Sequence, residues 1–172
     1  MIRKARQEDV GAIIKIIEFV HIKNISNKEN GFLASENLSE SFYLELINNY
    51  EYCYVYEINN KIVGFLIAYS NDFMDKKGEL DVYFINNYPN EGFVYIFQIG
   101  VDPNYQRKNI RSELYKKLFE EAHVKNFKVI TSKEPFNKAS RLFHQKLGFK
   151  DEGVFKWSDG VLSYIYGFKI DT

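Results

Sequence analysis

Apolar residues follow two spacings along this chain of 172 residues, and segments of the two kinds alternate. Apolar side chains at intervals of three and four residues predict helices that bury one face. Runs rich in β-branched and aromatic residues predict strands. The predicted helices are Asp9 to about Val20, Ser39 to about Asn48, Ile110 to Ala122, and Phe136 to Leu147. The predicted strands are Ile2–Ala5, Tyr52–Ile58, Lys61–Tyr69, Phe93–Val101, Phe127–Thr131, Val154–Trp157 and Val161–Ile170.

Residues that favour helix ends mark several of these boundaries. Asp9 and Ser39 are predicted N-caps, because their side-chain oxygens can accept hydrogen bonds from the first helical turn. Gly148 is the predicted end of the last helix. The second helix is expected to bury Phe42, Leu46 and Ile47.

Turns and connections follow from the same kind of signal. Asn59-Asn60 suits a tight hairpin because asparagine tolerates a positive φ, and Asp159-Gly160 suits the final hairpin. The polar stretch from Asn24 to Glu36 is predicted to be a loop. The longer connection from Asn71 to Gly92 is expected to be partly strand near Leu80–Phe84.

The order of the elements predicts an α/β fold with a central mixed sheet. The first strands are joined by short turns and should be antiparallel. The strand–helix–strand unit from Phe93 to Thr131 should make its two strands parallel. We therefore predict a single domain over residues 1–172, with antiparallel N-terminal strands, a parallel βαβ core and flanking helices.

Composition and charge exclude several classes of protein. The net charge is zero and the pI is about 6.8, whereas a nucleic-acid-binding domain is usually basic. Cys53 is the one cysteine, so no disulfide framework is expected, and His21 and His123 have no partners at metal-ligand spacing. No apolar run is long enough for a membrane span, and the N-terminus lacks a signal-peptide core. We expect a cytoplasmic protein without a metal, a nucleic-acid partner or a membrane partner.

The segment from Val101 to Leu114 predicts an anion site. A strand ends at Val101, a turn follows at Asp102-Pro103-Asn104, and a helix then begins within a basic stretch. The free N–H groups and the dipole of a helix N-terminus attract an anion, and a phosphate is the expected ligand. Five residues are positive and one is negative between Arg107 and Lys117. The alternative interpretation is a solvated basic helix face.

Two positions in this segment depart from an ordinary phosphate loop, which places small residues near the ligand. Asn109 can adopt the left-handed conformation at modest cost. The side chain of Arg111 must either leave the path of the phosphate or pair with it, and we expect it to pair.

Two stretches together resemble the GNAT superfamily of N-acetyltransferases. Val101, Pro103 and Gln106 match the family's pattern after its fourth strand, with Asn109 and Arg111 in place of two small residues. The N-terminal segment from Ile2 to Val10 is similar to the family's opening, and the Phe143-His144 pair resembles a bacterial branch. The family's later pattern is matched by Asn137, Ser140, His144, Gly148 and Phe149, with His144 where many members have tyrosine.

The resemblance implies the GNAT fold and an activity. The expected enzyme is an N-acetyltransferase that moves acetyl from the thioester of acetyl-CoA, its co-substrate, to a primary amine by direct attack. The expected acceptor is a small molecule, and the protein is expected to be a monomer or a homodimer. A peptide or protein acetyltransferase, and a non-catalytic acyl-CoA-binding or sensing module, are the alternatives.

The resemblance also implies cofactor-binding residues. Main-chain N–H groups at Ile99 and Val101 would polarise the thioester, and Gly100 would either allow close approach or pack against the following helix. Asn137 would bind the pantetheine arm, cap a helix, or do both, with Ser140 beside it. The phosphates are assigned to the loop and first helical turn, comprising Gln106, Arg107, Lys108, Asn109, Ile110, Arg111 and Ser112.

Catalytic groups are harder to assign. His144 is expected to lie beside the cofactor sulfur and help the thiolate leave. The strand from Phe93 to Val101 has no carboxylate, so Tyr95 is the candidate base, with transfer through water or capture of neutral amine as alternatives. Glu79, Asp81 and Glu91 are weaker candidates. The final hairpin would either line an acceptor pocket or complete an aromatic core through Phe155, Trp157, Tyr164 and Tyr166.

Overall fold

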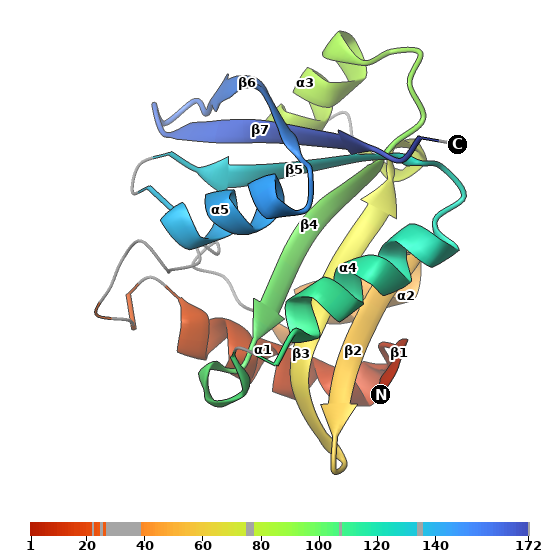
Figure 1. Ribbon diagram of the computed structural model, residues 1–172, viewed down its shortest axis with the longest axis vertical. Helices are drawn as coiled ribbons and strands as arrows, with labels where there is room; N and C mark the ends of the chain where they lie inside the picture. The colour runs from red at the N-terminus through yellow and green to blue at the C-terminus, as the bar shows by residue number, and fades with distance from the viewer. Residues whose placement is uncertain are drawn as a thin grey trace.

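The computed structural model describes residues 1–21, 23–24, 26, 39–74, 78–106, 108–133 and 136–171. Within these residues, strands and helices follow the predicted order except at residues 79–87, where a helix replaces a predicted strand (Figure 1). The helices are α1 (Val10–Val20), α2 (Glu40–Asn49), α3 (Glu79–Asn87), α4 (Ile110–Glu121) and α5 (Lys138–Lys146). The strands are β1 (Ile2–Lys4), β2 (Tyr52–Ile58), β3 (Lys61–Ser70), β4 (Val94–Val101), β5 (Asn126–Ser132), β6 (Lys150–Lys156) and β7 (Leu162–Lys169). Short 3-10 turns occupy Gln7–Asp9, Asn71–Phe73 and Pro103–Tyr105.

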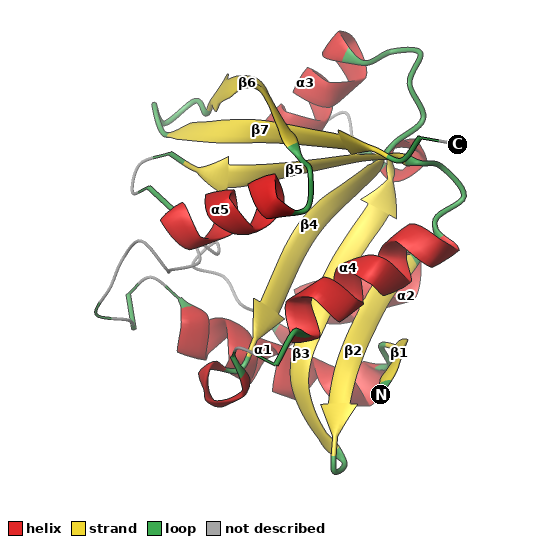
Figure 2. Ribbon diagram, viewed as in Figure 1, coloured by secondary structure: helices red, strands yellow, loops and turns green. Residues whose placement is uncertain are grey.

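The strands form one seven-stranded mixed sheet in the order β1-β2-β3-β4-β5-β7-β6 (Figure 2). Strands β1 to β4 pair antiparallel, β4 and β5 pair parallel, and β7 pairs antiparallel with both β5 and β6. The predicted mixed α/β sheet with a parallel centre is confirmed.

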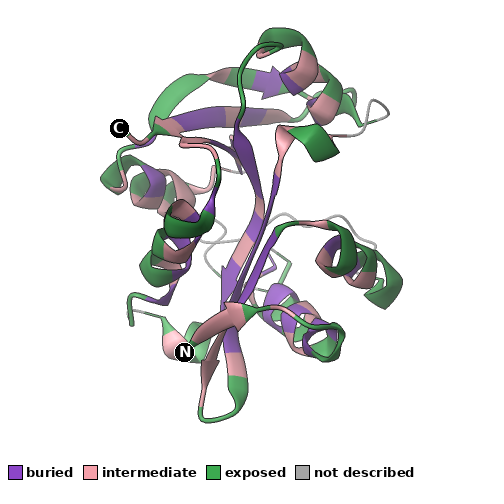
Figure 3. Cartoon of the chain, turned by 90° about the vertical axis from the view of Figure 1, so that its right-hand side faces the viewer, coloured by how far each residue is buried: buried purple, intermediate pink, exposed green. Residues whose placement is uncertain are grey.

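Helices cover both faces of the sheet (Figure 3). Alternate residues of the strands serve the two faces, as the period of a strand requires. Phe65 and Ile67 of β3 pack with α1 and α2, whereas Leu66 and Ala68 pack with α4. A third cluster places α3 against β4 and β7 through Leu80, Phe84, Phe93, Tyr95, Phe155 and Ile165.

Several predicted ends and turns are confirmed. Ser39 accepts a hydrogen bond from the Phe42 N–H at 3.2 Å and so caps α2. Asn59 and Asn60 have φ values of 49° and 61°, and Gly148 follows α5 with φ 95°. These residues tolerate the left-handed region that the turns require.

Three predictions about local structure are wrong. The segment near Leu80–Phe84 lies in helix α3, because burial of Leu80 and Phe84 one turn apart outweighs the strand propensity of its residues. In α2 the predicted Leu46 is buried together with Tyr43, whereas Phe42 is exposed and Ile47 is only partly buried. Asp9 does not cap α1, because the preceding 3-10 turn already gives it helical angles, and its carboxylate instead accepts from Arg3 and the Arg6 N–H.

The remaining expectations concern loops and membranes. Most of the predicted loop from Asn24 to Glu36 lies outside the described residues. Within the part of the chain that the structure describes, no helix is both long enough and apolar enough to cross a bilayer.

Candidate active site

Strands β4 and β5 separate after three paired positions. The pairs run from Val94 with Phe127 to Ile96 with Val129. Beyond that point β4 remains paired with β3 as far as Val101, and β5 remains paired with β7 as far as Ser132. Figure 1 shows the two strands diverging from their shared end. We call the separated segments, residues 97–101 of β4 and 130–132 of β5, the fork.

The fork exposes backbone donors on the β4 side. The N–H of Asp102 bonds the carbonyl of Val63 on β3, with an N–O distance of 2.9 Å. Because successive N–H groups of an extended strand point in opposite directions, those of Ile99 and Val101 point into the fork. The fork therefore presents the two backbone donors that the sequence assigned to a carbonyl oxygen.

Gly100 lies on the face of β4 that packs against α1. A Cβ there would lie 2.6 Å from the Phe65 ring and 3.2 Å from Ile16 of α1. The predicted packing against the following helix belongs instead to Gly64, where a Cβ would lie 2.8 Å from Ile110 of α4. These two glycines let α1 and α4 lie close to the strands that form one arm of the fork.

The turn after β4 is fixed by a buried carboxylate. Asp102 is 2% exposed and accepts hydrogen bonds from the Asn104 N–H at 2.9 Å and from Lys61 Nζ at 3.0 Å. Burial by itself would raise the pKa of Asp102, but the Asn104 N–H and the Lys61 ammonium lower the pKa below its ordinary value. The turn therefore holds the start of α4 in a defined place.

Helix α4 begins next to the end of β4. Asn109 takes the predicted left-handed conformation with φ 58°, and its carbonyl accepts from the Glu113 N–H. The N–H groups of Ile110, Arg111 and Ser112 precede that bond and have no acceptor within the helix. Gln106, Lys108, Asn109 and Ser112 are exposed around them, whereas Arg107 lies outside the described residues.

Arg111 lies across the gap between α4 and α5. Its guanidinium carbon is 5.0 Å from the centre of the Phe143 ring. Burial lowers the pKa of Arg111 from its ordinary value, and no carboxylate within the described residues forms an ion pair with it. Arg111 is a partly buried cation without a carboxylate partner in this part of the chain, so this position favours a negatively charged ligand.

Asn137 caps α5. Its side-chain oxygen accepts from the Ser140 N–H at 2.9 Å, which realises the capping alternative that the sequence left open. Contact of Asn137 and Ser140 with the pantetheine arm stays a prediction.

His144 is held from both sides of its ring. Nδ1 lies 2.7 Å from the Ser140 carbonyl, which can only accept, so Nδ1 carries the hydrogen. Nε2 is then the acceptor for the Tyr115 hydroxyl at 2.5 Å. Burial lowers the pKa of His144 to about 4, so the ring is neutral at pH 7. In this arrangement direct proton donation by His144 to a leaving thiolate needs the network to rearrange, and the role stays a prediction.

Tyr95 lies on the face of β4 that packs against α3. It packs in the aromatic cluster beneath α3, near Tyr69 and Phe84. Burial raises the pKa of Tyr95, so its phenol stays protonated at neutral pH. The base role therefore also stays a prediction. Within the β4 segment of the fork, Gln98 accepts a hydrogen bond from Tyr43 at 3.1 Å.

No sequence pattern predicts several of the buried hydroxyl groups near the fork. The hydroxyls of Thr131, Ser132 and Tyr166 are buried and have no hydrogen-bond partner within the described residues. Tyr166 was expected only as an aromatic lining or core residue. Pairing of β5 with β7 brings these side chains together, and no local pattern announces a contact between strands so far apart in sequence.

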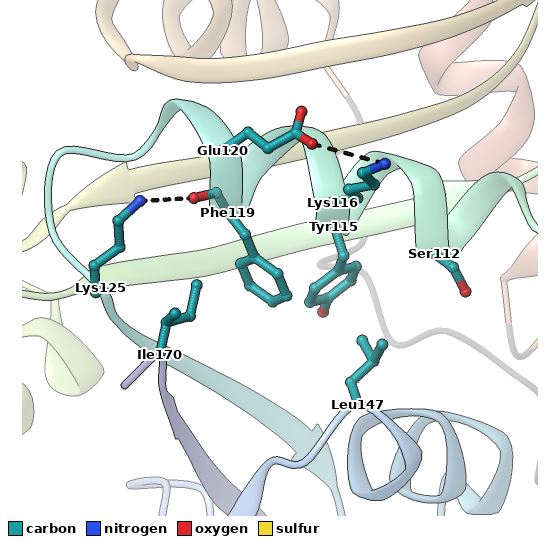
Figure 4. A pocket seen from close by; sticks show the side chains of 8 residues that line it. All are labelled: Ser112, Tyr115, Lys116, Phe119, Glu120, Lys125, Leu147 and Ile170. Carbon is teal, nitrogen blue, oxygen red and sulfur yellow. Dashed lines mark hydrogen bonds and ion pairs between the residues drawn. The ribbon is translucent and has the colours of Figure 1, made fainter. Parts of the chain in front are cut away.

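A groove of about 340 Å³ follows the side of α4 (Figure 4). Tyr115 and Phe119 point from α4 toward Leu147 and Ile170 and line this groove. On the opposite face, a hollow of about 520 Å³ lies beside α1 and includes Arg3 and Asp102. Within the described residues, no three His, Cys, Asp or Glu side chains are grouped to hold a metal ion.

A mixed sheet whose two parallel central strands separate beside a helix N-terminus defines a class of ligand-binding fold. Sequence comparison makes the assignment specific: the profile described as "Acetyltransferase (GNAT) family" matches residues 19–149. The chain belongs to the GNAT family of acetyltransferases. No curated protein sequence matches it significantly.

Solved structures of similar fold agree with this assignment. A protein of Streptococcus mutans UA159 superposes with a TM-score of 0.70 and 19% identity, covering 99% of each chain. An N-acetyltransferase of Staphylococcus aureus Mu50 gives a TM-score of 0.66 and 22% identity, covering 98% of this chain and 97% of that one. The yncA protein of Salmonella typhimurium, whose structure contains its cofactor acetyl-CoA, gives a TM-score of 0.67 and 18% identity, covering 100% and 94%.

Proposed function

We propose that this protein transfers acetyl from acetyl-CoA to the primary amine of a small molecule. The observation that carries the proposal is the fork, where the N–H groups of Ile99 and Val101 face an unpaired edge. The start of α4 lies next to it, with further unbonded N–H groups and the partly buried Arg111. Backbone donors suit a thioester carbonyl, and the helix start suits phosphates.

The residues present fit acetyl-CoA, which supplies an acetyl group activated as a thioester. The phosphate-binding group would be Gln106, Arg107, Lys108, Asn109, Ile110, Arg111 and Ser112. Ile99 and Val101 would hold the carbonyl, Gly100 would keep β4 close to α1, and Asn137 with Ser140 would lie along the pantetheine arm. Two donors fixed by the sheet need no reorganisation as negative charge develops on the carbonyl oxygen.

Few residues of this chain could act as the base that deprotonates the acceptor amine. No carboxylate lies on β4, and Tyr95 is protonated at neutral pH because burial raises its pKa. We propose that the acceptor enters as the small neutral fraction of the amine or loses its proton through water, so the rate should rise with pH toward the acceptor's own pKa.

The test is thiol release from acetyl-CoA with a panel of small amines and amino-terminal peptides. The expected result is turnover with at least one small amine, at a rate that grows with pH. Turnover confined to peptides would favour a peptide acetyltransferase. Binding of CoA without turnover on any acceptor would favour a non-catalytic acyl-CoA sensor.

A further inference from the structure

Tyr166 of β7 has a buried hydroxyl without a partner. Its side chain is 0% exposed, and no atom of the described residues forms a hydrogen bond with the phenolic oxygen. Such groups are rare in folded proteins because an unpaired buried hydroxyl costs free energy. Five other buried phenols have hydrogen-bond partners, namely those of Tyr43, Tyr52, Tyr54, Tyr69 and Tyr115.

The position of Tyr166 is at the fork. It pairs across the sheet with Val129, the last residue of β5 before the strands separate. Its hydroxyl neighbours that of Thr131, two residues further along the open segment of β5. The Thr131 oxygen is also buried. The two hydroxyls therefore lie close to each other where β4 and β5 begin to separate, and neither has a hydrogen-bond partner outside this pair within the described residues.

In this arrangement the neighbouring His144 has no ring N–H free to donate a hydrogen bond. The rings of His144 and Tyr166 are parallel within 4°, with centres 6.4 Å apart. His144 has committed both nitrogens to Tyr115 and Ser140, which leaves the phenol of Tyr166 as the unused donor on this side of the fork.

We infer that Tyr166 donates a hydrogen bond to the sulfur of CoA and is a catalytic residue of the acetyl transfer. The inference rests on the proposed use of acetyl-CoA. As the amine nitrogen bonds the carbonyl carbon, the C–S bond breaks and its electron pair goes to sulfur. The Tyr166 O–H stabilises that charge, and the proton released by the amine ends on the thiolate.

The surroundings keep this phenol a donor. Burial raises the pKa of Tyr166, as do Asp151 of β6 and Tyr164 of β7. Arg141 of α5 and the Thr131 hydroxyl of β5 oppose this rise. The phenol is therefore protonated at neutral pH, where a thiolate leaving group needs a donor.

The first experiment measures binding without turnover. The affinities of CoA and of desulfo-CoA, which has hydrogen in place of the thiol, are compared by calorimetry at pH 7 and pH 9. A thiol with a pKa near 8.5 ionises over this range, and a hydrogen bond to a charged acceptor is worth roughly tenfold or more in affinity. The wild type should prefer CoA by roughly tenfold at pH 9 and much less at pH 7.

Variants assign that preference to one side chain. Tyr166→Phe keeps the ring beside His144 and should bind both ligands equally at both pH values. Its kcat should fall by roughly 10²-fold with the KM for acetyl-CoA unchanged. Tyr54→Phe is the control, because it also removes a buried phenol, one that donates to Glu121 of α4 and not into the fork. It should keep the wild-type preference.

The outcomes separate the inference from the proposed function. If Tyr166→Phe keeps the pH-dependent preference, or if only His144→Gln loses it, Tyr166 is not the donor and the proposed function stands. If the wild type binds neither CoA nor desulfo-CoA, both are wrong.

Discussion

At the scale of single residues, Gly167 shows how one missing side chain admits a buried ion pair. A Cβ at Gly167 would overlap the carboxylate of Glu152, which crosses β7 from the edge strand β6. Glu152 reaches Lys128 on β5, whose side chain is 3% exposed, at 2.6 Å. It also accepts a hydrogen bond from Tyr88 at 3.0 Å. Glu152 therefore connects β6 with β5 across β7, and connects these strands with Tyr88, the residue after α3.

Gly167→Ala should displace Glu152 and leave the Lys128 ammonium buried without its partner. Loss of one member of a buried pair costs about 3 kcal/mol of unfolding free energy. Gly11→Ala is the matched control, since a Cβ there meets nothing within 4 Å and lies in helix α1. That variant should be stabilised by roughly 0.5–1 kcal/mol. Urea unfolding measures both, and equal effects of the two substitutions would contradict the explanation.

At the scale of elements, the first turn of α4 and its contact with α5 form the proposed anion site. Arg111 has no ion-pair partner in the described part of the chain, whereas Lys116, on the same helix, pairs with Glu120 at 3.8 Å. A phosphate near the start of α4 should therefore interact with Arg111 much more strongly than with Lys116.

Arg111→Gln should weaken CoA binding by roughly tenfold, and the salt dependence of the remaining affinity should be shallower. Lys116→Gln should change the affinity less than about twofold, because its charge is exposed and screened. Calorimetry between low and physiological salt gives both quantities. A stronger CoA affinity in Arg111→Gln would mean that Arg111 obstructs the loop.

The hydrogen bonds that join α4 to α5 through His144 should make stability depend on pH. The pKa of His144 is lowered from 6.5 to about 4 by burial, so the unfolded state binds a proton at higher pH than the folded state. The stabilisation that the neutral His144 contributes to the folded state is complete above pH 6.5 and is lost as the pH falls toward 4.

Between pH 7.5 and pH 5 the wild type should lose about 2 kcal/mol from this group. His144→Gln should be less stable at pH 7.5, but its stability should fall by about 2 kcal/mol less over the same range. Denaturant unfolding at the two pH values checks this. Parallel losses in both proteins would show that His144 titrates normally in the folded state.

At the scale of the whole molecule, the fork leaves β4 and β5 joined by only three paired positions. A ligand lying in the fork would connect the half of the sheet that carries α4 with the half that carries α5. Binding should therefore stabilise the whole fold.

Saturating CoA should raise the unfolding free energy by RT ln(1 + [L]/Kd), which is roughly 2.7 kcal/mol at a hundredfold excess over Kd. The melting temperature should rise accordingly, in one transition for both halves of the sheet. Thermal melts with acetyl-CoA, CoA and adenosine as a control measure this. An unmoved melting temperature at millimolar CoA, with no heat of binding, would remove the basis of the proposed function.

Local sequence signals determined most of the elements and part of the site. Ser39, Asn59, Asn60 and Gly148 act through their own backbone preferences, so caps and turns were predictable. Asn109 adopts the left-handed conformation for the same reason. The antiparallel pairing of the first strands and the parallel pairing of β4 with β5 also followed from the connections, because connection length limits how neighbouring strands can pair. The place of β7 between β5 and β6 was not predicted.

The tertiary structure decided whatever depends on contacts between distant segments. Helix α3 forms where residue propensities favour a strand, because Leu80 and Phe84 find an apolar surface on β4 and β7. The neighbours Phe42 and Tyr43 are equally apolar in sequence, and only packing against β4 selects Tyr43 for burial. His144 is neutral and bonded on both sides, and Tyr166 is unbonded, because of where α4, α5 and β7 meet. The sequence by itself specified the elements and the family to which their order belongs, while the state of each polar group at the fork depends on side chains that only the folded chain brings together.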